Sequence, residues 1–422
     1  MTGLLAVAIG FYAHADRLSI LRDAVERTDW PAAEAALGVL AGQPGADDPE
    51  VLFLTGMMAS AQNNWRRAAV AFRRLVDRHP EFPRPRLELA RILFIQGEDE
   101  AALAQFERVL ADDVPVAVAD NIRSFIDVIR TRQAWSVDLT LAPVVDDNLN
   151  GGTTHHTVEL GGLTFNVNQD AKAVRSDGII TGLRARRLLS AGGSWRHELS
   201  GGVVFKNYRR DDFDDTFVRL GYGLRRLATG AGVETGGGMF ATDRRIGGVP
   251  FSHSRGLRLD LRWPLGRAVS VEGAVEQQWV DYHRRPQRDG TLSWGSLGIQ
   301  IGLNAASLFV LSLDRLREQA SDPGLDLTSH GLSVGYYRDL PWGLTVGPNG
   351  RFSRTSYEVP SPFFGEQRRD HDLSLGIYFA KKNWVVSSLH LSINWSQERR
   401  LSSIDFFSYR RNRFVIAFDR RF

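Results

Sequence analysis

The residues best placed to do chemistry are charged side chains that share one face of each of two neighbouring segments with period-two alternation. They are Arg258, Asp260, Arg262, Glu272 and Glu276. Apolar residues occupy most of the positions between them, so an extended chain would separate a charged face from an apolar face. If the segments pair as antiparallel strands, opposite charges come within reach of each other. This face predicts either a polar path for a client molecule or an internal lattice of ion pairs.

Patterns typical of catalysis or metal binding are weak in this chain. His155 and His156 lie together in a polar stretch, but no carboxylate stands beside them at ligand spacing. There is no cysteine, which excludes disulfides and thiolate chemistry. We found no nucleophile elbow, no paired carboxylates and no glycine-rich phosphate loop. The sequence therefore predicts a protein that is not an enzyme and that has no metal site and no cofactor.

The charged positions belong to a long series of segments with period-two alternation, which predicts β-strands from about residue 135 to the C-terminus. One such segment places Leu373, Leu375, Ile377 and Phe379 on a single face. A soluble sandwich would bury such faces in a core about 10 Å thick. About fourteen strands in series, with charged inward faces, are more typical of an outer-membrane β-barrel. The expected strands are 135–147, 174–187, 195–209, 215–226, 232–243, 254–264, 268–281, 291–303, 307–319, 327–340, 343–357, 370–381, 385–398 and 408–422.

The expected connections alternate between two classes. Short turns such as 265–267 and 341–342 alternate with longer polar loops such as 148–173, 244–253 and 358–369. Outer-membrane barrels have short periplasmic turns and longer external loops, and an even strand count places both ends in the periplasm. We therefore expect residues 134–422 to form an antiparallel barrel of about fourteen strands in the outer membrane.

The last strand has the pattern expected of a barrel-closing element. Phe418 and Phe422 share its apolar face with two further apolar side chains. A terminal aromatic after alternating apolar residues resembles the signal read by the barrel-assembly machinery, which is an expected partner together with outer-membrane lipid. Arg420 places a charge in the lipid-facing register, where it can be tolerated near the interface because arginine snorkels.

Residues 16–133 instead show a helical period and an internal repeat. At a shift of 34 residues, Gly56 aligns with Ala90 and Phe72 with Phe106. Small residues at helix crossings and a large residue in the second helix are the spacing of tetratricopeptide repeats. Another α-hairpin solenoid would also fit. The sequence predicts an N-terminal α-solenoid in the periplasm, with a concave surface for a client or a periplasmic chaperone.

The first fifteen residues are expected to form a signal peptide. An apolar stretch from Leu4 to Tyr12 ends at Ala13-His14-Ala15, which has the pattern of a cleavage site. The stretch lacks a preceding Lys or Arg, which fits a start upstream of Met1. The alternative is the first helix of the helical domain.

Charge and hydropathy limit the function classes. The chain has 52 basic and 49 acidic residues, a formal net charge of +3, and no sustained basic run, so nucleic acid is not an expected partner. Mean hydropathy is −0.22. This value is compatible with a membrane barrel, because only half of the residues in its strands face lipid.

The chain resembles the surface lipoprotein assembly modulators, the Slam family. The residues that carry the resemblance are Asp147, Asn148, Asn150, Ser402, Tyr409 and the closing Phe422. The layout, a small tetratricopeptide domain before a barrel of fourteen strands, is also similar. The resemblance implies an outer-membrane translocation factor whose client is a surface lipoprotein or a secreted haem- or metal-acquisition protein.

Two other functions stay open from the sequence. An exopolysaccharide exporter would use the repeats as a scaffold for a synthase complex, although such proteins usually have more repeats and a lumen biased to one sign of charge. A passive porin would not explain the helical domain.

Overall fold

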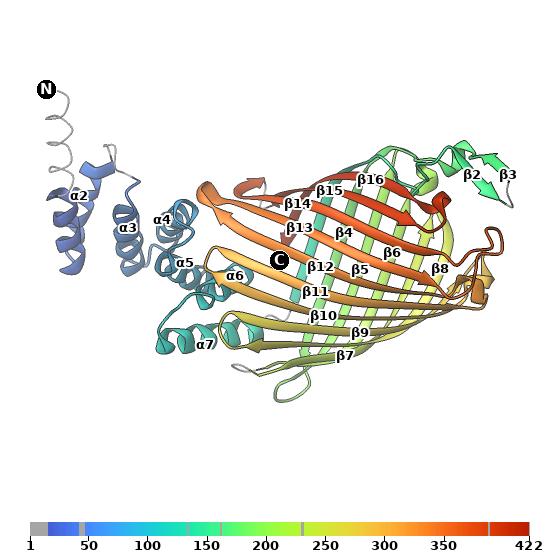
Figure 1. Ribbon diagram of the computed structural model, residues 1–422. Coiled ribbons are helices and arrows are strands. Elements are labelled where there is room, and N and C mark those ends of the chain that lie inside the picture. The colour runs from blue at the N-terminus through green and yellow to red at the C-terminus, as the bar shows by residue number, and fades with distance from the viewer. Residues whose placement is uncertain are drawn as a thin grey trace, which may run out of the picture. The chain divides into compact units, whose positions relative to one another are not determined.

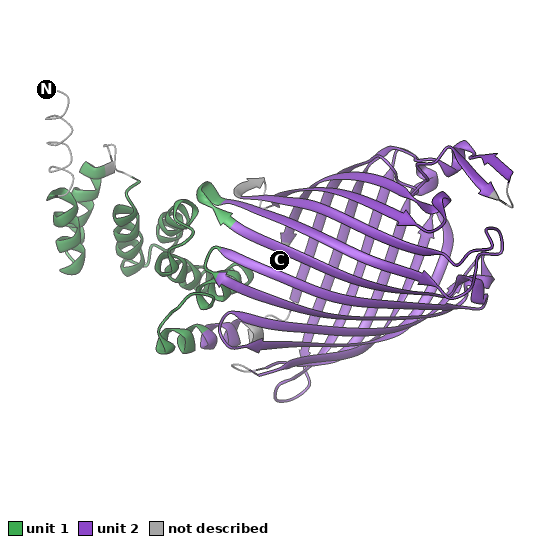
Figure 2. Ribbon diagram, in the orientation of Figure 1, with its two compact units in different colours: residues 1–122, 304–306, 339–343 green, residues 123–303, 307–338, 344–422 purple. Residues whose placement is uncertain are grey.

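The computed structural model describes residues 16–421 except 42–46, 133–134, 161–162, 229–231 and 387–388. The expected signal peptide at 1–15 and the terminal Phe422 lie outside the described residues. The chain divides into two compact units (Figure 2). The first contains residues 1–122 with the short segments 304–306 and 339–343, and the second contains the remainder. No helix in the described ranges is long and apolar enough to span a bilayer.

The N-terminal part is helical, as expected. Residues 16–26 form a helical segment. It is followed by α2 (Trp30–Ala41), α3 (Pro49–Ala61), α4 (Trp65–Arg78), α5 (Pro83–Ile95), α6 (Asp99–Leu110) and α7 (Val116–Arg132) (Figure 1). Local sequence sets the helix starts. The side chain of Asp48 accepts the backbone N–H of Glu50 at 2.8 Å, and Asn64 accepts that of Arg67 at 3.2 Å. Both are N-cap contacts that satisfy otherwise unpaired donors.

The predicted 34-residue repeat is present as two helix pairs, α3 with α4 and α5 with α6. Phe72 and Phe106, 34 positions apart, are each fully buried. A Cβ atom added to Gly56 would lie 2.6 Å from the Phe72 ring, so the glycine is what allows α3 and α4 to approach.

An ion pair links the α2 segment to the following repeat. Arg67 in α4 donates a hydrogen bond of 3.0 Å from Nη2 to Glu34 in α2. This hydrogen bond holds the pKa of Glu34 below its usual value. The pair therefore contributes stability at neutral pH that is lost when Glu34 is protonated in acid. Both side chains are partly exposed, so the contribution is small.

The remainder of the chain forms a closed barrel of fourteen antiparallel strands, which confirms the predicted fold class. The barrel strands are β1 (Trp135–Asp146), β4 (Ser176–Ser190), β5 (Trp195–Tyr208), β6 (Asp215–Arg226), β7 (Glu234–Ile246), β8 (Val249–Leu265), β9 (Val269–Tyr282), β10 (Gly290–Asn304), β11 (Ser307–Ala320), β12 (Leu327–Leu340), β13 (Leu344–Tyr357), β14 (Arg369–Val386), β15 (Leu389–Ser402) and β16 (Tyr409–Arg421). Each barrel strand pairs with its neighbours in sequence, and β16 pairs with β1 to close the sheet (Figure 1).

Three of the expected connections differ in the structure. The expected turn at 382–384 lies within β14, which continues to Val386. The segment expected as a loop over 148–173 contains a small two-stranded sheet, β2 (Thr157–Leu160) and β3 (Leu163–Asn166). The expected loop over 244–253 is a tight hairpin instead. Gly247 and Gly248 form its turn with φ values of 56° and 75°. Only glycine adopts two such values in succession without strain, so β7 and β8 extend to the turn.

Alternation gives each barrel strand an outward and an inward face. On β8, Leu257 and Leu259 point outward and are 51% and 62% exposed. Arg258, Asp260 and Arg262 point the other way, toward the lumen. Residues directly opposite on neighbouring strands share a face, so the ladders extend this assignment around the barrel.

Candidate functional site: the charged barrel lumen

The five charged residues identified in the sequence all face the lumen on β8 and β9. Arg258 lies opposite Glu276, and Arg262 lies opposite Glu272. Arg258 Nη1 donates to Glu276 Oε1 at 2.8 Å, and Arg262 Nε lies 3.5 Å from Glu272 Oε1. Asp260 accepts a hydrogen bond from Arg258 Nε at 3.3 Å. The structure thus brings these residues together through cross-strand ion pairs.

The same network includes an arginine on β6 that the sequence analysis did not identify. Arg225 contacts three carboxylates: Glu198 at 2.5 Å, Glu234 at 3.1 Å and Asp260 at 3.0 Å. These partners lie on β5, β7 and β8, so Arg225 ties four strands together. Only 14% of its side chain is exposed.

A second arginine on β6 extends the network to β9. Arg219 Nη2 donates to Glu276 Oε1 at 2.9 Å. Its guanidinium also lies 3.6 Å from the centre of the Phe240 ring, within the range of a cation–π contact. Arg219 and Arg225 are six residues apart on one face, with only glycines between them on that face. That spacing is the sequence signal that could have identified them.

Glycines on β7 make room for these long side chains. A Cβ atom at Gly236 would lie 2.8 Å from Nη2 of Arg225 and 3.1 Å from Oδ2 of Asp260. Because no side chain stands there, the guanidinium from β6 crosses β7 and reaches the carboxylate on β8. A cavity of about 670 Å³ adjoins the network, and its lining includes Arg219, Arg225 and Asp260. The lumen wall is therefore polar and rigidly cross-linked at this position.

Ion pairs of the same kind occur elsewhere in the barrel. They include Arg244 with Asp215, Arg351 with Asp314, Arg400 with Asp372, and Arg411 with Asp146. Both signs of charge are present throughout. A wall of paired charges offers hydrogen-bond donors and acceptors to a polar chain without selecting strongly for one sign.

The motif at the end of β1 holds the first external loop against β16. Asn148 is only 1% exposed. Its Nδ2 donates to the carbonyls of Gly152 and Arg410 at 2.9 Å each, and its Oδ1 accepts the Gly152 N–H at 2.7 Å. Asp147 accepts the backbone N–H of Asn412 at 2.6 Å. Asn150 accepts the N–H of Val174 at 3.0 Å and donates to the carbonyl of Lys172 at 2.8 Å. These contacts give Asp147, Asn148 and Asn150 a structural role at the barrel seam.

Ser402 and Tyr409 lie at the external ends of β15 and β16. The backbone N–H of Ser402 donates to the hydroxyl of Ser408 at 3.0 Å, which closes the hairpin around the short turn 405–407. Tyr409 donates from its hydroxyl to Glu398 at 2.5 Å, and the Arg400 guanidinium lies 5.0 Å from its ring centre. Tyr409 therefore joins the charged lumen network.

Phe418 lies at the seam between the first and last strands. It is opposite Leu141 on β1 and Leu391 on β15, so it belongs to the outward, lipid-facing row. The β1–β16 ladder omits Ala142 and Pro143, although both have partners in β4. Because proline has no N–H to donate, the seam is interrupted at this point.

His155 and His156 lie in the first external loop, away from this network. Across the described ranges, no group of three or more His, Cys, Asp or Glu residues has the geometry to hold a metal ion.

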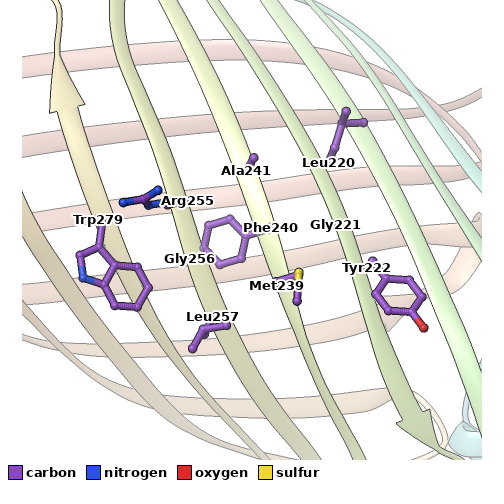
Figure 3. A pocket seen from close by; sticks show the side chains of 10 residues that line it. All are labelled: Leu220, Gly221, Tyr222, Met239, Phe240, Ala241, Arg255, Gly256, Leu257 and Trp279. Carbon is purple, nitrogen blue, oxygen red and sulfur yellow. The ribbon is translucent and has the colours of Figure 1, made fainter.

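The apolar hollow in Figure 3 lies on the outward side of β6 to β9. Its volume is about 760 Å³, and Leu220, Met239, Leu257 and Trp279 are among the residues that line it (Figure 3). Leu220 and Met239 are more than 60% exposed, at 64% and 61%. Apolar outward side chains of this kind suit hydrocarbon, so the hollow belongs to the lipid-facing surface.

Comparison with known proteins decides the family. The model of the surface lipoprotein assembly modifier barrel matches residues 135–422, and that of the family's N-terminal TPR repeats matches residues 14–106. The chain belongs to the surface lipoprotein assembly modifier family. This is a family of outer-membrane assembly barrels rather than a known class of enzyme. The barrel lies in the outer membrane and the tetratricopeptide repeats lie in the periplasm.

Curated relatives match along most of their length. The chain is 25% identical to surface lipoprotein assembly modifier 1 of Neisseria meningitidis serogroup B, over 90% of this chain and 77% of the relative. It is 22% identical to the surface lipoprotein assembly modifier of Pasteurella multocida, over 96% of this chain and 82% of the relative. Among solved structures, the outer-membrane channel DcaP of Acinetobacter baumannii is similar with a TM-score of 0.40 and 9% identity, over 68% of this chain and 96% of the channel.

Proposed function

We propose that this protein moves a client protein across the outer membrane to the cell surface. The client is a surface lipoprotein or a secreted haem- or metal-acquisition protein, and the barrel lumen is its polar route. Family membership supports the coarser role in surface lipoprotein assembly. The observation that favours a translocation route is the lumen wall of β5 to β9, where Arg225 and Arg258 are paired with carboxylates of both neighbouring and more distant strands.

A client that crosses as a polypeptide needs a path that satisfies its backbone groups. Unpaired peptide groups in lipid cost several kcal/mol each, roughly, so an extended chain must be shielded from hydrocarbon. A lumen with paired donors and acceptors can exchange hydrogen bonds with such a chain. The repeats supply a concave surface that binds the client or a periplasmic chaperone before transfer. Folding of the client outside the cell supplies the driving force.

The test combines deletion of the repeats with client display. A strain that lacks the gene is complemented with the full chain or with a variant that lacks residues 30–132. Protease accessibility of a co-encoded lipoprotein on intact cells is measured, with barrel insertion checked by heat modifiability. We expect the deletion to abolish client exposure while the barrel still inserts. Unchanged client exposure with lost small-solute uptake would favour a porin, and lost surface polysaccharide would favour an exporter.

A charge swap tests the lumen itself. Arg258→Glu breaks the ion pair with Glu276 and should reduce client exposure several-fold. The double variant Arg258→Glu/Glu276→Arg restores opposite charges at the same two positions. Arg219 and Asp260 then face like charges, so display should recover only in part. Equal display by the wild type and both variants would contradict a role for this wall in transfer.

A further inference from the structure

The outward face of the barrel has an unequal distribution of charge near the external loops. Strands β11 to β16 lie side by side and run from orange to red in Figure 1. At the external ends of most of these strands, an outward position carries arginine. We define the outer-face cationic patch as Arg315 on β11, Arg354 on β13, Arg399 on β15 and Arg410 on β16. All four side chains are exposed.

The ladders place these arginines on the lipid-facing side and not in the lumen. Arg315 follows Leu313 by two positions, and Arg354 follows Phe352 by two positions, so each pair shares a face. Leu313 is 53% and Phe352 46% exposed on that face. Arg399 is directly opposite Leu373, another outward residue with 46% exposure. The patch therefore begins where the apolar band ends. On β11 and β13, each arginine lies two residues, or about 7 Å, beyond the last apolar outward residue.

The register brings two arginines of the patch next to each other. Arg399 on β15 lies directly opposite Arg410 on β16. Like charges directly opposite each other on neighbouring strands destabilise a sheet. Beside a hydrocarbon layer the repulsion is greater than in water, so this arrangement favours an anion between the strands.

The protein does not supply that anion from its own side chains. For Arg315, Arg354, Arg399 and Arg410, no ion pair with an acidic side chain is present within the described residues. The acidic residues of these strands point into the lumen, and several of them pair with arginines there. Asp314 pairs with Arg351, for example, and Asp372 pairs with Arg400. Just beyond β13, Glu358 pairs with Arg317, which leaves the four arginines of the patch without an acidic partner in the described part of the chain.

The opposite side of the barrel differs. On β4, β7 and β9, outward positions near the external ends include Asp177, Asp243 and Asp281, each placed by its partner in the ladder. Acidic and basic residues are mixed there, so the field is weaker. Across the described strands, the patch of outward arginines without an acidic partner therefore lies in the β11–β16 half.

We propose that the outer-face cationic patch binds the phosphate groups of a phosphorylated glycolipid in the outer leaflet, of the lipid A type. Arginine forms bidentate, charge-assisted hydrogen bonds with phosphate, and its apolar stem can lie along the lipid chains. The acyl chains of the same lipid pack against Leu313, Phe352 and Leu373. The bound lipid neutralises the facing arginines and fixes the depth and orientation of this half of the barrel.

The test uses purified full-length protein in neutral detergent with diphosphoryl lipid A as the probe. Retention of lipid is counted by native mass spectrometry for the wild type and for Arg354→Gln/Arg399→Gln/Arg410→Gln. We expect at least a tenfold loss of apparent affinity in the triple variant. Lipid A without phosphates should bind weakly to both proteins, and excess inorganic phosphate should compete only poorly if the lipid chains contribute.

The matched control replaces three outward arginines at the periplasmic ends of strands: Arg187→Gln/Arg226→Gln/Arg338→Gln. This variant should bind diphosphoryl lipid A as the wild type does. If the patch variant does not assemble, Arg399→Gln and Arg410→Gln are measured singly, each with an expected loss of about threefold or more. Equal affinity of the wild type and every folded patch variant, or equal binding of phosphorylated and dephosphorylated lipid, would overturn the proposal.

Discussion

At the scale of single residues, the lumen stability depends on keeping buried charges paired. A buried ion pair adds little net stability over an apolar pair, but removing one partner leaves an uncompensated charge. Loss of Arg225 should have the largest effect, since its guanidinium pairs with three carboxylates. Loss of Glu276 should have a similar but smaller effect, because this carboxylate accepts hydrogen bonds from two arginines, Arg219 and Arg258.

Replacement of Arg225 by alanine should destabilise the barrel by about 3–5 kcal/mol, because Glu198, Glu234 and Asp260 would repel each other without a cation. The midpoint of urea unfolding in micelles, followed by the heat-modifiable band, measures the loss. The control is Arg209→Ala, which breaks an ion pair with Asp177 whose side chains are 79% and 53% exposed. That pair should contribute less than about 1 kcal/mol. Equal midpoints for the two variants would contradict the argument.

The sequence indicated only part of this network, for a physical reason. Arg258 and Glu276 were identifiable because consecutive strands pair and their alternation fixes which residues share a face. The contact between Arg225 and Asp260 crosses the intervening strand β7 and depends on two ladder registers and on the absence of a side chain at Gly236. Alternation alone does not give the register between strands, so this contact could not be predicted.

At the scale of elements, hydrophobic periodicity predicted well which segments form helices and which form strands. It predicted the turns between them less well. The repeat of 34 residues predicted the pairs α3–α4 and α5–α6 because small and large residues alternate at the crossing positions. The hairpin at Gly247-Gly248 was missed because polar flanking residues suggested a loop, whereas the two glycines allow a turn of two residues. The small β2–β3 sheet was missed because strands of four residues are too short for alternation to be distinctive.

The helix crossing at Gly56 gives a prediction for the repeats. Gly56→Ala places a Cβ atom 2.6 Å from the ring of Phe72, which is fully buried and cannot move aside freely. We expect a loss of about 1–3 kcal/mol from overpacking. Thermal unfolding of the full chain in micelles, followed by circular dichroism at the helical band, should show the helical transition at lower temperature. Adding Phe72→Leu should recover part of the loss.

Gly38→Ala is the control for that experiment. Gly38 lies inside α2, and an added Cβ atom there meets nothing within 4 Å. Alanine favours a helix interior over glycine by about 1 kcal/mol, so this variant should unfold at the same or a higher temperature. A lower transition temperature for both variants would show that the close approach at Phe72 is not the cause.

At the scale of the whole molecule, the barrel depends on the contact between its first and last strands. A closed sheet leaves no unpaired edge in lipid, where unsatisfied backbone groups are costly. β16 closes the sheet against β1 from Asp138 opposite Arg421 to Asp146 opposite Arg413, with a gap at Ala142 and Pro143. Because the seam is already interrupted there, closure relies on the remaining pairs and on the lipid-facing contacts of Phe418.

Replacement of Phe418 by aspartate should therefore prevent assembly. The change removes the outward contact with Leu141 and Leu391 and places a charge in the lipid-facing row of the closing strand. Fractionation should find the variant unassembled in the periplasm, with no heat-modifiable barrel in the outer membrane. Deletion of Phe422 should have the same effect if the terminal aromatic is the residue that the barrel-assembly machinery recognises.

Phe363→Asp is the control, since Phe363 is 84% exposed in an external loop and its replacement should leave assembly intact. A normal barrel in the outer membrane of the Phe418→Asp strain would show that closure does not depend on this residue.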